Sequence, residues 1–154
     1  MDKQYYLGEI RARLSPKRYE HSVNVAKAAV RLAKKYGANP EQAELAGILH
    51  DITKETEPAV QLEILRDFGI MLDTVEQSPY KLLHAISAFC LVEEQYGIRD
   101  REVLNAIRYH TTARSGMPLL EKVVYVADFI SADRDYDGVD VMRRRAEESL
   151  ESAM

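Results

Sequence analysis

Several features that define other protein classes are absent from this sequence. It contains one cysteine in 154 residues, Cys90, so no internal disulfide can form. Cys90 lies between Phe89 and Leu91, and we predict that it is a small core residue. The lack of a second cysteine also excludes thiolate-type zinc sites and iron–sulfur clusters.

Long apolar runs and positive net charge are absent as well. No stretch approaches the ~18 apolar residues of a membrane span, and the first residues, 1–6, lack the apolar region of a signal peptide. The sequence therefore predicts a soluble cytoplasmic protein with no membrane partner. The net charge of -4 argues against a nucleic-acid polymer as ligand, but it is compatible with a nucleotide held by metals and a few basic side chains.

What remains is an ordinary globular composition with 46% hydrophobic and 30% charged residues. Its length predicts a single domain, 1–154. Helical periodicity runs almost throughout, and the fold class is predicted to be an all-α bundle of about seven to eight helices with short connections. The expected helices cover about residues 5–14, 16–36, 40–51, 56–68, 79–96, 101–110, 119–130 and 139–150, with a turn or short helix at 73–78.

Caps set several of these boundaries. Ser15 and Asn39 each precede a proline and are predicted to begin helices, and Gly37 is predicted to end one. Gln42 lies three residues after Asn39, as in a capping box. The β-branched content of residues 123–130 would also suit a strand.

All four histidines, His21, His50, His84 and His110, lie on or at the end of an apolar helical face. A single histidine of this kind is commonly a hydrogen-bonded core residue, but four of four is harder to explain in that way. Asp128 is the only charged residue between Val123 and Ala132. An unpaired buried carboxylate costs several kcal/mol, so a cation partner is expected.

A metal would explain the histidines and the aspartate together. Imidazole and carboxylate ligands suit iron, manganese, zinc or cobalt. The candidate ligands exceed the three or four protein ligands of most single-metal catalytic sites; they are His21, His50, Asp51, His84, His110 and Asp128. Two metals sharing Asp51 would use all six, and such pairs commonly act in phosphoryl displacement.

The order His21, His50-Asp51, Asp128 resembles the signature of the HD-domain superfamily of metal-dependent phosphohydrolases, and the chain is most similar to the bacterial YqeK-type HD proteins. The segments that carry the resemblance are 18–23, 49–54, 83–85, 107–112, 122–129 and 134–138. The resemblance implies an all-helical HD fold and symmetrical hydrolysis of diadenosine tetraphosphate to two ADP at an iron-containing dinuclear centre.

The resemblance also assigns roles. His21, His50, Asp51 and Asp128 would hold the first metal, and His84 and His110 the second, with Asp51 as bridge and catalytic residue. A metal-bound hydroxide would attack a phosphate in the middle of the polyphosphate chain. The expected nucleotide-binding residues are the metal ligands His21, Asp51, His84, His110 and Asp128, together with Arg18, Lys54, Asp133 and Arg134.

The basic residues in this set can also be judged from their own positions. Lys54 follows His50 at helical distance and could neutralise phosphate charge in catalysis, or it could be a solvated lysine beside Glu55. Arg18, three residues before His21, and Arg134 could reach a polyphosphate or lie on the surface. The loop 133–138 is predicted to be a turn.

Two other functions stay open from the sequence. One is an HD phosphohydrolase acting on a nucleoside monophosphate, a cyclic nucleotide or a guanosine alarmone. The other is a non-catalytic helical interaction module with structural histidines. Whether the chain forms a homodimer also stays open.

Overall fold

The computed structural model describes residues 1–69 and 80–154, and all statements below refer to them. These parts contain eight α-helices, one short 3₁₀ helix and no strand, which confirms the all-α prediction. The helices are α1 (Lys3–Arg13), α2 (Pro16–Tyr36), α3 (Pro40–Leu49), α4 (Pro58–Phe68), α6 (Tyr80–Glu94), α7 (Arg101–Arg108), α8 (Leu119–Ile130) and α9 (Val139–Glu148), followed by η1 (Glu151–Ala153).

The predicted caps begin and end the helices as expected, with one exception. Ser15 accepts a hydrogen bond from the Arg18 amide at the start of α2, and Gly37 ends that helix with φ 89°. Asn39 caps α3 through the amide of Gln42. The prediction of a capping box at Asn39 is wrong. The Gln42 side chain donates to Asp100, the N-cap of α7, at 2.8 Å and does not turn back to Asn39.

Two helices end earlier than their sequence patterns suggested. α3 ends at Leu49, so His50 is its C-cap and Asp51 to Lys54 lie in the turn that follows. α7 ends at Arg108, and His110 lies beyond it. Residues 119–130 form helix α8, so the strand alternative is wrong. The predicted turn at 73–78 and the predicted helix start at 78–79 fall outside the described residues.

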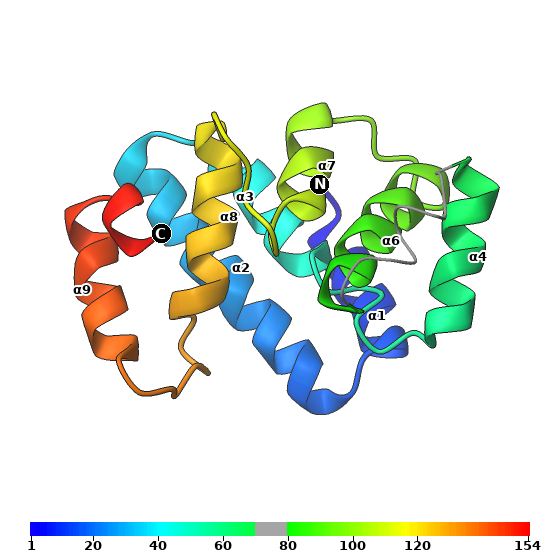
Figure 1. Ribbon diagram of the computed structural model, residues 1–154, viewed down its shortest axis with the longest axis horizontal. Coiled ribbons are helices and arrows are strands. Elements are labelled where there is room, and N and C mark those ends of the chain that lie inside the picture. Colours follow the sequence, from blue (N-terminus) through cyan, green and yellow to red (C-terminus); the bar gives the residue numbers. More distant parts are fainter. Residues whose placement is uncertain (70–79) are drawn as a thin grey trace.

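α2 runs diagonally through the middle of the molecule (Figure 1) and packs on α3 and α8. α7 packs on α3, α6 and α8, while α4 at one edge packs on α6 and α9 at the opposite edge packs on α8. One hydrophobic cluster joins residues of α1, α2, α3, α6, α7, α8 and α9. Leu65 of α4 and Leu83 of α6 form a second, small cluster.

α2 and α3 pack closely against each other. A Cβ atom added to Gly47 would lie 2.7 Å from the Cα atom of Ala26, so glycine is what lets the two backbones meet. His21 precedes Ala26 by five residues and His50 follows Gly47 by three. The crossing therefore brings these two histidines together.

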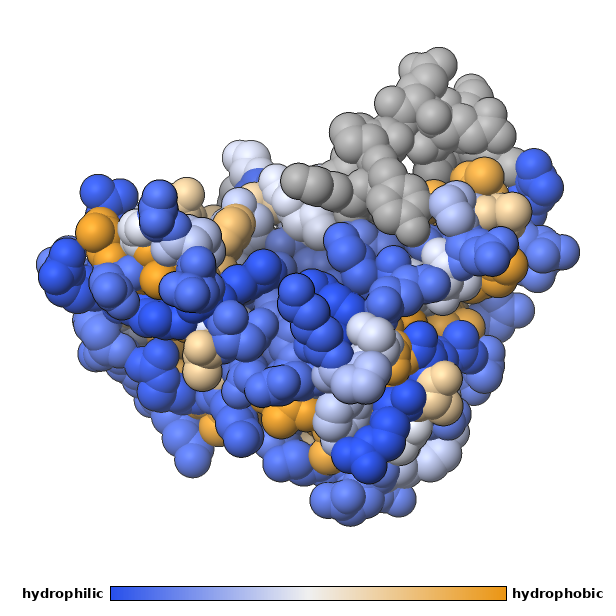
Figure 2. Space-filling view, turned by 90° about the horizontal axis from the view of Figure 1, so that it is seen from below, coloured by the Kyte–Doolittle hydropathy of each residue, from blue (hydrophilic) through white to orange (hydrophobic). Residues whose placement is uncertain are grey.

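No helix in the described ranges is long and apolar enough to cross a bilayer. The face shown in Figure 2 is predominantly hydrophilic, with apolar side chains in small separate areas.

Candidate metal centre

The six residues predicted from the sequence converge at one place. They come from five helices or their ends: His21 from α2, His50 and Asp51 from the end of α3, His84 from α6, His110 from the end of α7 and Asp128 from α8. The four histidines and Asp51 are buried, and the Asp128 side chain is 20% exposed. Overlapping sets of three place their ligand atoms within 4.8 Å of one another.

Two of the histidines are oriented by the helix that precedes them. His50 Nδ1 donates to the carbonyl oxygen of Gly47 at 2.6 Å, and His110 Nδ1 donates to that of Ile107 at 2.6 Å. A carbonyl only accepts, so the proton lies on Nδ1 and Nε2 faces the cluster as a potential ligand. Both carbonyls belong to the last helical turn, where backbone oxygens lack intrahelical partners.

The first group of ligand atoms surrounds one oxygen of Asp51. Asp51 Oδ2 lies 3.9 Å from His21 Nε2 and 3.5 Å from His50 Nε2. Asp128 Oδ1 lies 2.8 Å from His21 Nε2 and 3.6 Å from His50 Nε2. Ligands at ~2.1 Å from one ion lie about 3.0–3.4 Å apart, so these separations suit a single metal with modest adjustment.

The second group uses the other oxygen of Asp51. Asp51 Oδ1 lies 3.4 Å from His84 Nε2 and 3.8 Å from His110 Nε2, and the two imidazole nitrogens are 3.2 Å apart. Asp51 therefore presents one carboxylate oxygen to each group. This is the arrangement that a bridging carboxylate requires.

An unpaired atom supports cation binding. His50 Nε2 is fully buried and has no hydrogen-bond partner among the described residues. Leaving a buried nitrogen unpaired costs roughly 1–3 kcal/mol, and a metal would satisfy it. The donor set of nitrogen and carboxylate oxygen points to a divalent metal site.

The charges of the cluster are strongly coupled. Burial opposes protonation of His50, but the Asp51 and Asp128 carboxylates outweigh it and raise the pKa of His50 to about 9. Burial also opposes ionisation of both carboxyls, yet nearby histidines hold the pKa of Asp51 and that of Asp128 well below the ordinary value. Burial and the charge of His50 lower the pKa of His110 to about 4. The carboxylates are therefore ionised and His110 is neutral, as metal ligation requires, whereas His50 carries a proton on Nε2 that a metal would have to displace.

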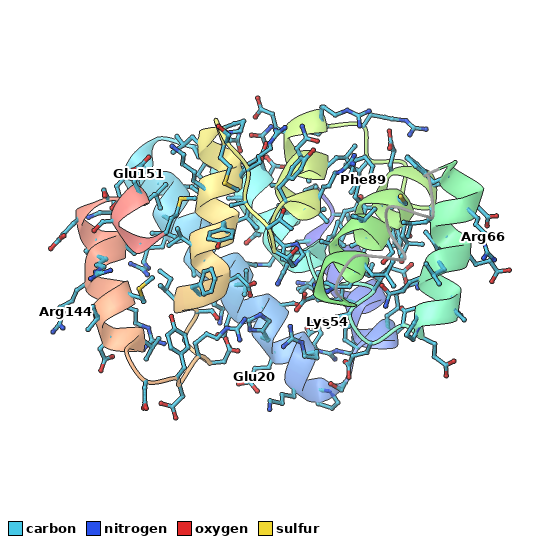
Figure 3. All side chains as sticks on the ribbon, viewed as in Figure 1. Glu20, Lys54, Arg66, Phe89, Arg144 and Glu151 are labelled. Atoms are coloured by element: carbon cyan, nitrogen blue, oxygen red, sulfur yellow. The ribbon has the colours of Figure 1, made fainter. Side chains whose placement is uncertain are left out.

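Three cationic side chains predicted to meet phosphate lie at this cluster. Arg18 Nη2 donates to Asp51 Oδ2. Arg134 donates from Nη2 to Asp128 Oδ1 at 3.0 Å and from Nε to the Asp128 carbonyl at 2.8 Å. Lys54 is partly buried in the turn after α3 (Figure 3), close enough to His84 for its charge to oppose protonation of that imidazole.

Asp133 makes a contact with His21 that the sequence did not predict. Its Oδ2 accepts from His21 Nδ1 at 2.7 Å, on the side of the ring opposite the cluster. A carboxylate behind a ligating histidine fixes the ring and makes it a stronger ligand. The prediction that Asp133 contacts nucleotide stays a prediction.

A buried polar network behind His84 was also missed. Thr53 Oγ1 lies 2.8 Å from the His84 carbonyl oxygen, to which it donates, and 2.8 Å from Ser87 Oγ. Ser87 donates to Gln61 Oε1 at 2.9 Å, and Gln61 Nε2 donates to the Thr56 carbonyl at 2.7 Å. The network joins the turn after α3 to α4 and α6. Its only signal in the sequence is polar residues on otherwise apolar faces.

A family model described as HD domain matches residues 18–133, which is more than half of the chain. The chain belongs to the HD domain family. The matched range contains all six clustered residues of the HD domain and ends at Asp133.

Two curated relatives of this HD domain share a name. A Bacillus subtilis protein named bis(5'-nucleosyl)-tetraphosphatase, symmetrical, is 38% identical over 100% of this chain and 82% of its own length. A Staphylococcus aureus protein of the same name is 39% identical over 87% of this chain and 69% of its own. They confirm the resemblance to the YqeK-type HD proteins.

A solved structure supports the same fold. The crystal structure of a Clostridium acetobutylicum protein, described as a predicted HD superfamily hydrolase involved in NAD metabolism, is 34% identical with a TM-score of 0.89. The match covers 99% of this chain and 81% of the other. The helical arrangement is therefore that of an HD domain.

Proposed function

We propose that this HD domain hydrolyses diadenosine tetraphosphate symmetrically to two ADP. The observation that carries the proposal is Asp51, which turns one oxygen toward each of two groups of imidazole ligands. Metal pairs bridged in this way suit phosphoryl transfer. The names of the Bacillus subtilis and Staphylococcus aureus relatives support the choice of substrate.

We further propose which residues hold the metals. His21, His50, Asp51 and Asp128 take the first, and His84 and His110 take the second with Asp51 as the bridge. A bound divalent pair supplies an activated water and positive charge at the phosphate. Asp51 has the central role because its substitution removes a ligand from both groups at once.

The remaining proposed roles concern phosphate charge and ligand orientation. Arg18 and Lys54 neutralise phosphate oxygens, Lys54 in catalysis, and Arg134 does so beside Asp128. Asp133 positions His21 and borders the nucleotide. The proposed nucleotide-binding set is Arg18, His21, Asp51, Lys54, His84, His110, Asp128, Asp133 and Arg134.

The proposal also covers the native metal, the domain, its location in the cell and its partners. Iron is the proposed native metal, because the resemblance to the YqeK-type HD proteins implies it. The imidazole and carboxylate donor set alone suits manganese, cobalt or zinc equally well. Residues 1–154 are proposed to form a single HD domain in the cytoplasm, where nucleotide substrates occur. A nucleic-acid polymer and a membrane are not among the proposed partners.

The test is product analysis with purified protein and diadenosine tetraphosphate. ADP as the only product supports the proposal, whereas AMP plus ATP, or no reaction, refutes it. Metal analysis should find about two transition-metal ions per chain, with loss of metal in His50→Ala. Asp51→Asn should abolish hydrolysis without loss of helical circular dichroism, and the exposed Asp67→Asn on α4 is the matched control.

A further inference from the structure

Helix α9 carries an arginine whose side chain turns back to the end of α8. Arg143 Nε donates to the carbonyl oxygen of Ile130 at 3.1 Å. Its Nη2 donates to the carbonyl oxygens of Ser131 at 2.9 Å and Arg134 at 3.0 Å. The Ile130 carbonyl belongs to the last turn of α8, where backbone oxygens lack intrahelical partners. One planar guanidinium therefore binds three backbone carbonyls at the end of α8 and just after it.

The segment that Arg143 binds is a tight turn. The Arg134 amide donates to the Ser131 carbonyl oxygen at 2.9 Å, which closes the turn over Ala132 and Asp133. The two carbonyls that accept from Arg143 Nη2 are those of the first and the last residue of this turn. Arg143 thus fixes the turn relative to α9 at both of its ends.

The last two residues of this turn each contact the candidate metal centre. Asp133 Oδ2 accepts from His21 Nδ1 at 2.7 Å, and the Arg134 guanidinium donates to Asp128 Oδ1 at 3.0 Å. The His21 side chain is 2% exposed, whereas that of Asp133 is 25% exposed. A partly exposed carboxylate can exchange the imidazole for water, so the contact depends on a fixed backbone beneath Asp133.

We propose that Arg143 is a positioning residue of the metal centre. By holding the turn 131–134, it keeps Asp133 on His21 Nδ1, so that His21 Nε2 faces Asp128. A carboxylate behind a ligating histidine fixes the ring and makes it a stronger ligand. The inference rests on the metal ligands of the proposed function and goes beyond them, because Arg143 lies outside the residues, 18–133, that match the HD domain model.

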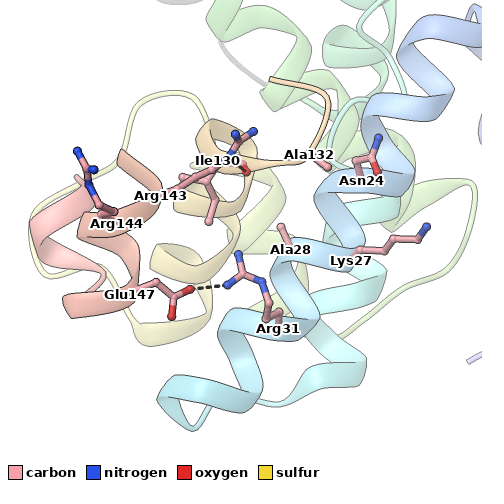
Figure 4. Close-up of a pocket in the computed structure, with 9 residues that line it drawn as sticks. All are labelled: Asn24, Lys27, Ala28, Arg31, Ile130, Ala132, Arg143, Arg144 and Glu147. Atoms are coloured by element: carbon pink, nitrogen blue, oxygen red, sulfur yellow. Dashed lines mark hydrogen bonds and ion pairs between the residues drawn. The ribbon is translucent and has the colours of Figure 1, made fainter. Parts of the chain in front are cut away.

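Arg143 also lines a cavity of about 640 Å³ between α2 and α9, together with Arg31 and Arg144 (Figure 4). The charges of its wall are largely committed to protein partners. Arg31 donates to Glu147 at 2.6 Å, and Arg143 donates to the three carbonyls. The wall therefore supplies two controls: Arg144, the exposed neighbour of Arg143 on α9, and Arg31, which ties α2 to α9 through Glu147.

The experiment is calorimetric titration of the metal-free protein with Mn²⁺. Arg143→Met keeps an unbranched side chain but removes all the donors, and it should weaken Mn²⁺ binding roughly 10-fold, the lower end of the effect of losing the partner of a metal ligand. Arg144→Met and Arg31→Met should leave the affinity unchanged. Arg143→Lys keeps a donor without the planar fork, so it should lose less affinity, and it serves as the test if the methionine variant does not fold.

A double-mutant cycle separates positioning from a general loosening of the fold. In an Asp133→Ala protein, Arg143→Met should change the Mn²⁺ affinity by no more than about twofold, because the contact that Arg143 supports is already lost. An equally large loss with and without Asp133 would overturn the inference. Wild-type Mn²⁺ affinity in the folded Arg143→Met protein would overturn it as well.

Failure of the proposed function gives a different result. A wild-type protein that binds Mn²⁺ but leaves diadenosine tetraphosphate intact would refute the proposed hydrolysis, and the double-mutant cycle would still decide the role of Arg143. A wild-type protein that binds no Mn²⁺ would overturn both the metal ligands and the role of Arg143.

Discussion

Replacing Gly47 with alanine tests how the α2–α3 crossing builds the metal centre. The new Cβ atom would lie 2.7 Å from Ala26 Cα, 3.0 Å from Ala26 N and 3.2 Å from Ala26 Cβ. These neighbours are mainly helix backbone, which cannot rotate away as a side chain can. The helices must separate, and His21 and His50 must move with them.

The expected loss of stability follows from how far the new contact falls below an ordinary van der Waals distance. The closest contact is about 0.7 Å below the 3.4 Å of an ordinary contact, and overpacking of this kind costs about 1–3 kcal/mol. Alanine at an open helical position instead gains up to about 1 kcal/mol over glycine. We therefore expect a net loss of up to about 3 kcal/mol, seen as a melting temperature lower by up to about 12 °C for a chain of this size. Metal affinity should fall as well.

The assay is thermal unfolding of metal-free protein, followed by metal titration. Gly8→Ala is the matched control, because it makes the same change within α1 at a position with no atom within 4 Å of the added Cβ. It should leave stability unchanged or raise it. A Gly47→Ala protein that is as stable as the Gly8→Ala protein and binds metal normally would refute the reasoning.

Three further predictions concern the centre and its support. Asp133→Asn should weaken metal binding roughly 10- to 100-fold by titration, since His21 loses its anionic partner, whereas Asp135→Asn should not. Because the pKa of His50 is about 9, a metal must displace its proton, so apparent affinity should rise about tenfold from pH 7 to pH 8; a flat profile would contradict this. Thr53→Val should cost about 1–3 kcal/mol in denaturant unfolding, and an effect below 0.5 kcal/mol would contradict its role in the buried network.

The sequence predicted the metal-centre residues and most helix boundaries correctly, because single residue types indicate these features. Histidines on apolar faces and a lone aspartate in a buried helix are costly without a shared partner, and the structure brings all of them together. Prolines and glycines also predicted most helix boundaries. Local chemistry decides these features, so it can be read from a single chain.

Two of the errors have a common cause in contacts between distant segments. Gln42 has the spacing of a capping box, but Asp100, 58 residues away, accepts its hydrogen bond. Asp133 lies 112 residues from His21, and no periodicity relates the two. Tertiary packing decided these two features. Helix periodicity also extended α3 through Asp51, whereas α3 ends at Leu49 and the His50 imidazole bonds to the Gly47 carbonyl of the same helix, which is a local feature.

Arg18 pairs with a carboxylate of the candidate metal centre. Its guanidinium contacts Asp51 Oδ2, the oxygen that also faces His21 and His50. A divalent cation at that oxygen competes with the arginine for the same charge. The Arg18 side chain is 24% exposed, whereas that of Asp51 is 3% exposed, so the arginine is the partner that can move outward. We therefore propose that a cation held by Asp51 would leave the Arg18 guanidinium free to pair with a phosphate group of the substrate.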